Sequence, residues 1–184
     1  PLKRQALWRE KGVMPRGGDG PRFRDCDHAY VLGAVDFLRS YRGDEPFCLY
    51  LPLSAPHPPY KAEQGFYDAI DPALLPPRLP VPEHDLPALD ALRAAYGAER
   101  VSEAAWGDLK RVYYAMCAKI DHLFGQVVEA LEAGGLYDDT LVVFLSDHGD
   151  FAGDYALPEK THLSLQDALI RVPFVVKPPA AVGA

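Results

Sequence analysis

Two short, almost unbroken apolar runs constrain the fold of this 184-residue chain more than any other feature. The first covers residues 47–53 (FCLYLPL), and the second covers residues 140–145 (TLVVFL). Runs of this length are typical of strands that are buried on both faces of a parallel sheet. Pro52 has no backbone N–H, which indicates that the first strand ends there. A third run, residues 172–176 (VPFVV), predicts another strand near the end of the sequence.

The segments between these runs carry helical patterns. The clearest covers residues 102–133, where apolar side chains recur every three or four residues. Ser102 or Asp108 is expected to cap this helix, and Gly134-Gly135 to end it. A shorter helix is predicted from Asp27 to about Gly43. Strands that alternate with helices indicate an α/β fold with a predominantly parallel sheet flanked by helices.

Two segments differ in composition from the rest of the chain. Residues 1–25 hold seven basic and three acidic side chains and a Gly/Pro-containing run, which predicts a basic loop. Its simplest interpretation is a solvated loop, with an anion contact as the alternative. Residues 54–90 are rich in proline, so we expect a long surface loop that shapes a substrate opening. Disorder is the alternative there, but scattered Tyr, Phe, Leu and Ile favour partial packing.

Charge and hydropathy exclude several classes of protein. The chain has 26 acidic and 19 basic residues, a net charge of −7, so a general nucleic-acid binder is not expected. No apolar run approaches the roughly 20 residues that a membrane-spanning helix needs. The three cysteines do not have the spacing of a zinc ribbon or a disulfide scaffold.

Polar clusters follow the first two predicted strands. Residues 54–60 (SAPHPPY) come after the first strand, and residues 146–150 (SDHGD) come after the second. The carboxyl ends of parallel strands meet at one edge of a sheet, so we expect His57 to lie near Asp147 and His148. A carboxylate beside an imidazole suits a divalent metal, although two donors do not complete a site. An Asx turn followed by a surface histidine is the structural alternative.

Two further side chains are candidates for chemistry. His57 stands between prolines, which restrict its loop and suit a general acid or an oxyanion donor; an incidental surface histidine is the alternative. Lys160 can present a cation to an anionic substrate, or it can be a solvated lysine. Asp154 and His162 occur in the same stretch as Lys160 and are possible accessories.

Four ordered segments of the chain resemble the sulfatases, a family of the alkaline-phosphatase superfamily. Residues 134–150 (GGLYDDTLVVFLSDHGD) are similar to the second metal-binding segment of that family, and residues 55–60 (APHPPY) are similar to its active-site histidine loop. Glu159-Lys160 and residues 171–176 (RVPFVV) resemble its substrate-lysine region and the next strand. The similarity covers most of residues 28–178.

This resemblance implies a fold, an activity and a set of site residues. The fold would be alkaline-phosphatase-like, with residues 26–184 as the central part of the catalytic domain, which is then only partly present. The activity would be metal-dependent hydrolysis of sulfuric esters, acting on an anionic small molecule. Asp147 and His148 would bind the divalent metal, with Ca²⁺ expected first and Mn²⁺ or Zn²⁺ as alternatives. His57 and Lys160 would be catalytic and would contact the sulfate group.

Two parts of the family pattern are absent from these 184 residues, the nucleophile motif and the early paired aspartates that complete the metal shell. Sulfatases carry a Cys/Ser-x-Pro-x-Arg motif whose first residue becomes a formylglycine nucleophile, and Cys26, Cys48 and Cys117 all lack this context. We therefore expect the nucleophile upstream of this chain and no turnover by the chain alone. Hydrolysis of phosphonate or phosphate esters is an alternative function, and a non-catalytic binding homologue is another.

Overall fold

The computed structural model describes residues 12–14, 26–43 and 45–182 of the chain. It divides into two compact units. Unit 1 consists of Pro1–Arg16, Pro56–Cys117 and Leu145–Pro173, and unit 2 consists of Gly17–Ala55, Ala118–Phe144 and Phe174–Ala184. Apart from residues 12–14, the predicted basic loop at residues 1–25 lies outside the described residues.

The long predicted helix is confirmed almost to the residue. Helix α5 covers Glu103–Ala133, and the Ser102 hydroxyl accepts a hydrogen bond from the Ala105 N–H at 3.2 Å. Its end is fixed by Gly135, whose φ of 66° lies in the left-handed region that favours glycine. The Leu136 N–H then reaches back to the Leu131 carbonyl at 2.9 Å.

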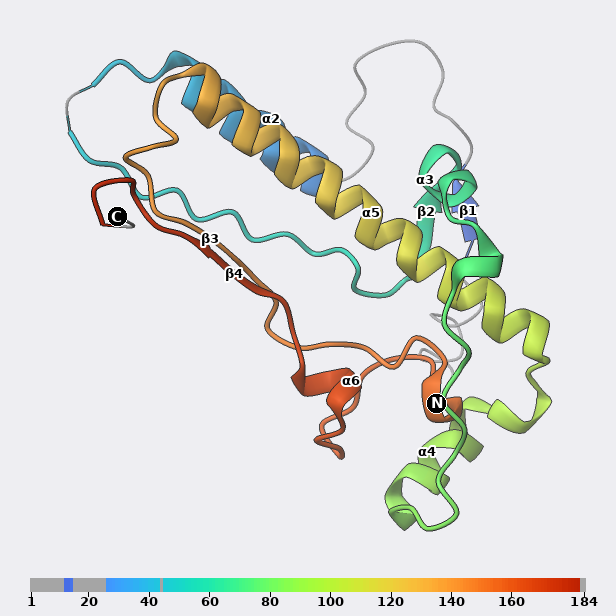
Figure 1. Cartoon of the computed structure of the whole chain (residues 1–184). Helices are drawn as coiled ribbons and strands as arrows, with labels where there is room; N and C mark the ends of the chain where they lie inside the picture. Colours follow the sequence, from blue (N-terminus) through green and yellow to red (C-terminus); the bar gives the residue numbers. More distant parts are fainter. Residues whose placement is uncertain (1–11, 15–25, 44, 183–184) are drawn as a thin grey trace. The chain divides into compact units, whose positions relative to one another are not determined.

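Unit 2 is built around two helices. Helix α2, Cys26–Ser40, lies beside the second half of α5 (Figure 1). Their facing sides share an apolar cluster because each helix repeats its buried residues at helical spacing; the members are Val31, Val35, Leu38, Ile120, Leu123, Val127, Ala130 and Leu131. Full burial of one such large side chain contributes about 1.5–3 kcal/mol. This cluster is therefore the main source of stability within unit 2.

The first predicted strand, residues 47–53, is not a strand in the structure. The segment keeps an alternation of side chains, since Phe47, Leu51 and Leu53 pack against the helical cluster while Tyr50 is 83% exposed. No strand among the described residues pairs with this segment, so it has no ladder of hydrogen bonds. The buried Asp27 carboxylate instead accepts the N–H groups of Ser54 and Ala55, at 2.9 and 2.8 Å.

The other two predicted strands are present and pair with each other. Strand β3 covers Val142–Leu145, and β4 covers Phe174–Lys177 (Figure 1). The Ser146 N–H bonds to the Pro173 carbonyl at 3.4 Å, and the Ala180 N–H bonds to the Asp138 carbonyl at 2.8 Å. These bonds join the end of one strand to the start of the other, so β3 and β4 run antiparallel.

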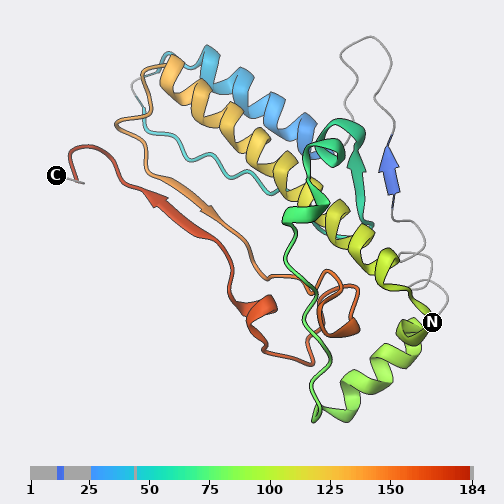
Figure 2. The same ribbon diagram turned by 45° about the vertical axis from the view of Figure 1, so that its right-hand side comes forward.

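A predominantly parallel sheet is therefore not confirmed. The described residues hold one parallel pair, in which β1 (Gly12–Met14) lies beside β2 (Lys61–Glu63) with Gly12 opposite Lys61 (Figure 2). The apolar runs predict strands well, but they do not fix strand direction, because direction depends on how the chain returns between strands. Helices and small sheets are nevertheless both present.

Unit 1 contains the first part of α5, up to Cys117, and several short elements joined by loops. Helix α3 covers Gln64–Ala69, α4 covers Pro87–Tyr96 and α6 covers Asp167–Ile170; the 3-10 turns η1, η2 and η3 cover Pro72–Leu74, Ala98–Arg100 and Asp154–Ala156. One apolar cluster of this unit consists of Leu89, Phe151, Leu157 and Leu169, and α5 adds the buried side chains of Trp106, Leu109, Val112 and Met116.

The Pro-rich segment at residues 54–90 is partly folded, in agreement with the predicted partial packing. It contains β2, α3 and the start of α4. The Tyr67 hydroxyl donates to Asp108 at 2.8 Å, and the Arg111 guanidinium stacks 4.0 Å from the Tyr67 ring. Asp108, one of the two predicted caps, lies inside α5. It accepts the hydrogen bond of Tyr67 and does not cap the helix. Within the described residues, no helix is both long and apolar enough to span a bilayer.

Candidate functional site

Three loops of unit 1 meet at the hydroxyl group of Tyr60. This side chain is 2% exposed, and its oxygen lies 2.9 and 3.0 Å from the two Asp150 carboxylate oxygens and 2.7 Å from the Pro158 carbonyl. The single hydroxyl proton can be donated to one of these acceptors at a time. Tyr60 follows His57 by three residues, Asp150 follows His148 by two, and Pro158 precedes Lys160 by two. The contact therefore joins the three segments that carry the predicted site residues.

Asp150 is the acceptor around which these loops are arranged. Its carboxylate accepts the Ala152 N–H at 2.8 Å and also the backbone N–H of Lys160. Burial raises the pKa of Asp150 to about 6, although these hydrogen bonds and the charge of Lys160 act in the opposite direction. Burial, followed by the nearby Asp150 charge, also raises the pKa of Tyr60 far above its usual value, so Tyr60 is a hydrogen-bond donor.

Lys160 presents a buried ammonium group that has no hydrogen-bond partner. Among the buried side-chain nitrogen and oxygen atoms of the described residues, only Lys160 Nζ and Gln166 Oε1 lack a partner. A buried ammonium without an acceptor is costly, because it has lost its water without gaining a replacement. The negative charge of Asp150 acts on it without a direct hydrogen bond. An anion beside Nζ would supply the missing acceptor.

Asp147 and His148 form a turn directly after β3. Asp147 is open to solvent, with 86% of its side chain accessible; one carboxylate oxygen accepts the His148 N–H at 2.9 Å and the other lies 3.9 Å from His148 Nε2. His148 Nδ1 lies 2.7 Å from the Gly149 carbonyl. A carbonyl only accepts, so Nδ1 is the donor in this contact, and in the neutral ring Nε2 then holds the lone pair. The turn therefore presents a carboxylate and an imidazole whose Nε2 can act as a ligand when the ring is neutral.

Gly149 is required for this turn by a close approach of the backbone. Its N–H donates to the Leu169 carbonyl at 2.8 Å, and a Cβ atom at this position would lie 2.0 Å from the Ala168 carbonyl oxygen. No side chain fits that space without moving the backbone. Gly149 thus joins the turn to helix α6.

The donors at this turn fit part of a metal site. A carboxylate oxygen and a neutral imidazole nitrogen are suitable ligands for a divalent cation. Within the described part of the chain, no three His, Cys, Asp or Glu side chains gather closely enough to hold a metal. A metal held at this turn would therefore need further ligands from other residues.

His57 has the same local arrangement as His148. Its side chain is exposed, and its Nδ1 lies 2.7 Å from the Pro58 carbonyl, so Nδ1 is the donor in this contact. Among the described residues, no hydrogen bond or ion pair joins the side chains of His57 and Lys160 to those of Asp147 and His148. The structure brings their loops together through Tyr60 and Asp150, and not the four side chains themselves.

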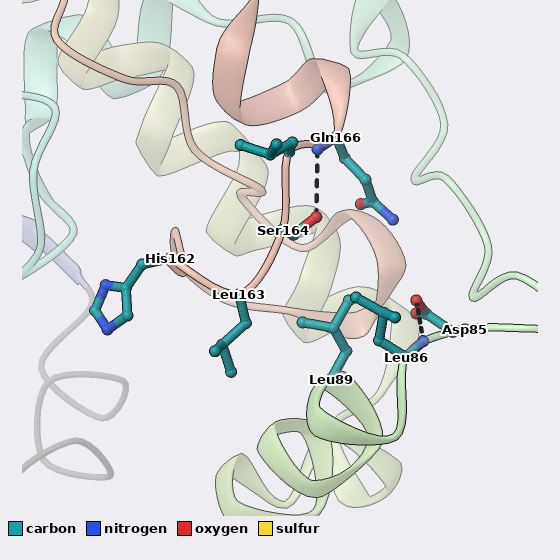
Figure 3. Close-up of a pocket in the computed structure, with 8 residues that line it drawn as sticks. Asp85, Leu86, Leu89, His162, Leu163, Ser164 and Gln166 are labelled. Atoms are coloured by element: carbon teal, nitrogen blue, oxygen red, sulfur yellow. Dashed lines mark hydrogen bonds between the residues drawn. The ribbon is translucent and has the colours of Figure 1, made fainter.

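The two possible accessory residues have different surroundings. Asp154 forms an ion pair with Lys110 at 2.7 Å and accepts the Leu79 N–H at 3.0 Å, so its role is to hold loops together. His162 lines a cavity of about 650 Å³, which is within the size range of small-molecule sites (Figure 3). The other lining residues are Asp85, Leu86, Leu89, Leu163, Ser164, Leu165 and Gln166. The cavity lies on the segment that follows Lys160.

Tyr60 and Asp150 are the two site residues for which sequence reasoning predicts no role. Both occur within the polar clusters at residues 54–60 and 146–150, which was the available signal. Their importance depends on burial and on a contact across 90 residues of sequence. Neither property can be read from local spacing.

Comparison with known proteins gives a consistent family. The family model described as Sulfatase matches residues 14–182. The chain is 27% identical over 200 residues to the multifunctional alkaline phosphatase superfamily protein PehA of Trinickia caryophylli, covering 96% of this chain and 38% of that protein. It is 30% identical over 164 residues to choline-sulfatase of Rhizobium meliloti (strain 1021), covering 84% of this chain and 32% of that protein.

Similarity of structure agrees with the similarity of sequence. The phosphonate monoester hydrolase SpPMH from Silicibacter pomeroyi matches with a TM-score of 0.69 at 22% identity. The match covers 97% of this chain and 40% of that protein, and it establishes a shared fold. The chain thus spans between about a third and two fifths of the length of these proteins.

Proposed function

Because this chain belongs to the sulfatase family, we propose that it supplies the anion-binding and part of the metal-binding side of a metal-dependent sulfuric ester hydrolase. The substrate is an anionic small-molecule ester. The observation that carries this proposal is the ammonium group of Lys160, which is buried and has no hydrogen-bond partner. The loop that carries Lys160 is joined to the loops of His57 and of Asp147 and His148 through the hydrogen bonds of Tyr60.

Lys160 holds a sulfate oxygen as a point charge. An ammonium already removed from water interacts more strongly with an anion than a solvated one does, because the surrounding dielectric constant is low. No reorganisation of solvent is then needed as negative charge develops on the ester during S–O cleavage. The backbone hydrogen bond to Asp150 keeps this lysine in place.

His57 acts on the leaving oxygen. Its Nδ1 proton is donated to the Pro58 carbonyl, so Nε2 is the nitrogen that faces a substrate. Once protonated, Nε2 can donate to the sulfate group or to the leaving alkoxide. Its exposed position leaves it accessible to an ester that enters from solvent.

Asp147 and His148 Nε2 would hold the divalent cation, with Ca²⁺ proposed first and Mn²⁺ or Zn²⁺ as alternatives. A bound cation would neutralise charge on the ester oxygens and favour the ionised nucleophile. The carboxylate and imidazole orient their donor atoms through the turn at Gly149.

The cysteines of this chain are poor candidates for the nucleophile. Cys26 and Cys48 are exposed and lack the Cys-x-Pro-x-Arg context. Burial raises the pKa of the Cys117 thiol to about 11, which disfavours the reactive thiolate. We propose that a formylglycine nucleophile comes from a segment outside these 184 residues, and that this chain alone turns over no ester.

Hydrolysis of phosphonate or phosphate esters is the second candidate function. It is favoured by the structural similarity to a phosphonate monoester hydrolase, and a tetrahedral phosphonate would also satisfy Lys160. A non-catalytic binding homologue is the third. The gene sequence upstream of Pro1 separates it from the two enzymes, since a Cys-x-Pro-x-Arg motif there supports catalysis and its absence supports binding alone.

The test compares ester hydrolysis by the full-length gene product and two lysine variants. 4-Nitrophenyl sulfate and a 4-nitrophenyl phosphonate monoester are offered side by side, with Ca²⁺, Mn²⁺ or Zn²⁺ present. We expect turnover of the sulfate, and a loss of about 100- to 1,000-fold in kcat/KM for Lys160→Met. Lys61→Met, which changes an exposed lysine of β2, is the control and should stay within about twofold. Equal activity of the two variants would contradict the role of Lys160.

A further inference from the structure

A buried acid beside the substrate lysine has no assigned part in the reaction. Asp150 is not a candidate ligand of the metal, and its carboxylate faces the Tyr60 hydroxyl and the backbone N–H groups of Ala152 and Lys160. The Ala152 bond is a local turn contact, but the Tyr60 hydroxyl comes from 90 residues earlier in the sequence. Most side-chain hydrogen bonds of a surface loop are local, so the Tyr60 contact distinguishes Asp150.

The contacts of Asp150 act on Lys160 in two ways. The carboxylate accepts the backbone N–H of Lys160, which fixes the start of its side chain. Its charge also attracts the ammonium, whose nitrogen is buried and has no direct partner. This attraction acts over a distance and does not need a direct hydrogen bond. The N–H groups of the ammonium therefore remain available for an anion.

Tyr60 completes this arrangement from the His57 loop. Its hydroxyl lies within hydrogen-bond distance of both Asp150 and the Pro158 carbonyl, two residues before Lys160. The ring of Tyr60 also packs edge-on against Tyr113 of α5, with ring centroids 6.2 Å apart. Tyr60 thereby links the loop that carries Lys160 to the first part of α5 within unit 1.

We propose that Asp150 is a positioning residue, which with Tyr60 holds Lys160 so that its ammonium stays buried and ready for the sulfate group. This inference rests on the proposed function, because it assumes that Lys160 binds the substrate anion. Asp150 itself contacts no reacting atom. Its contribution is to the placement of Lys160, and misplacement of a binding group by about 1 Å can reduce a rate by about 100-fold.

The experiment uses the full-length gene product and measures two quantities. The first is kcat/KM for 4-nitrophenyl sulfate. The second is the rate at which acetic anhydride acetylates the Lys160 amine, followed by mass spectrometry, and this does not need catalysis. Asp150→Asn keeps the size of the side chain and one acceptor oxygen but removes the charge. Asp154→Asn is the matched control. It removes an acid from the same loop, but this acid pairs with Lys110.

We expect Asp150→Asn to lower kcat/KM by about 10- to 100-fold. Its Lys160 amine should be acetylated about fivefold faster or more, since a loosened side chain opens to the reagent. Asp154→Asn should instead speed acetylation of Lys110 and leave Lys160 unchanged. In a protein in which Lys160 is already replaced by Met, Asp150→Asn should lower kcat/KM by less than about twofold. A purely structural role would not produce this result.

The outcomes separate this inference from the proposed function. Equal values for Asp150→Asn and Asp154→Asn, in both kcat/KM and Lys160 acetylation, would overturn the positioning role. Absence of hydrolysis by the unaltered protein, together with faster Lys160 acetylation in Asp150→Asn, would reject the hydrolase and leave the positioning role supported. Tyr60→Phe serves as the second variant if Asp150→Asn does not fold, and it should change acetylation of Lys160 in the same direction but less.

Discussion

The two units of the chain both bury apolar side chains, but they differ in how their loops are held. Within unit 2, helices α2 and α5 share a cluster of eight buried apolar residues, with one buried carboxylate, Asp27, at its edge. Unit 1 also buries apolar residues, among them Trp106, Leu109 and Val112, but its loops are joined by polar contacts of Tyr60, Asp150 and Asp154. Apolar packing does not fix the direction of a side chain, whereas hydrogen bonds fix the positions of individual atoms. The candidate site lies where such polar contacts join the loops.

Backbone conformation shows the same difference. Three residues other than glycine have positive φ angles among the described residues, and all three, Ala152, Tyr155 and Ala156, lie between Asp150 and Lys160. Each such conformation costs about 1 kcal/mol or more and persists where surrounding contacts enforce it. Strain concentrated beside the candidate site is consistent with a loop that is shaped for function at some cost in stability.

The largest effect on stability is expected from Leu123→Ala in unit 2. Leu123 is 2% exposed in the helical cluster, so its truncation should lower the free energy of unfolding by about 3 kcal/mol. Chemical denaturation measures this loss, and kcat/KM per folded molecule should remain unchanged. A large drop in kcat/KM at full folding would break the distinction between the two units.

Gly149→Ala should have a smaller effect on stability and a larger one on function. A Cβ atom here meets the Ala168 carbonyl oxygen at 2.0 Å, so the backbone of the turn must move. Overpacking of this kind costs about 1–3 kcal/mol. We expect weaker binding of the divalent cation, measured by isothermal titration calorimetry, because Asp147 and His148 are displaced. Gly125→Ala, in α5 with open space around the added carbon, is the control.

Acid should destabilise unit 1 through the ion pair of Asp85 and Arg93. Burial raises the pKa of Asp85, but hydrogen bonds from Arg93 and the Leu86 N–H outweigh this effect and hold the pKa below its usual value. The unfolded state then binds a proton more readily, so the contribution of this pair is present above about pH 4 and is lost as the pH falls further. Urea denaturation from pH 6 to pH 3 measures the loss. Asp85→Asn should show a shallower dependence on pH, and an equal slope would contradict the assignment.

The smallest effect is an increase in stability. Ala156 has a φ of 55°, and glycine adopts this region without steric cost. Ala156→Gly should therefore raise the free energy of unfolding by about 0.5–1 kcal/mol, once the greater freedom of glycine in the unfolded chain is included. Thermal denaturation gives the comparison. A loss of stability would mean that this loop is not strained.

Sequence patterns predict the parts of this fold that depend on local spacing. The 31-residue helix α5 follows from its apolar repeat, and the strands at residues 142–145 and 174–177 follow from their apolar runs. The segment at residues 47–53 has the same pattern but forms no strand, because a strand also needs a hydrogen-bonded neighbour. Strand direction was likewise outside the reach of local patterns.

The candidate site follows the same rule. The loops of His57 and of Asp147 are joined by the Tyr60–Asp150 contact and not at the edge of a parallel sheet, and the expected proximity of His57 to Asp147 and His148 stays a prediction. Lys160 is an ordinary lysine in sequence, and only its burial without a partner distinguishes it from a solvated one. Roles that arise from burial and from distant contacts need the structure.

The proposed function depends on binding of a tetrahedral anion by the buried ammonium of Lys160. Its most direct test is a crystal structure of the full-length gene product grown with inorganic vanadate and without sulfate or phosphate. We expect a vanadate oxygen within about 3.2 Å of Lys160 Nζ. Vanadate bound elsewhere, with Lys160 Nζ turned out into solvent, would contradict it.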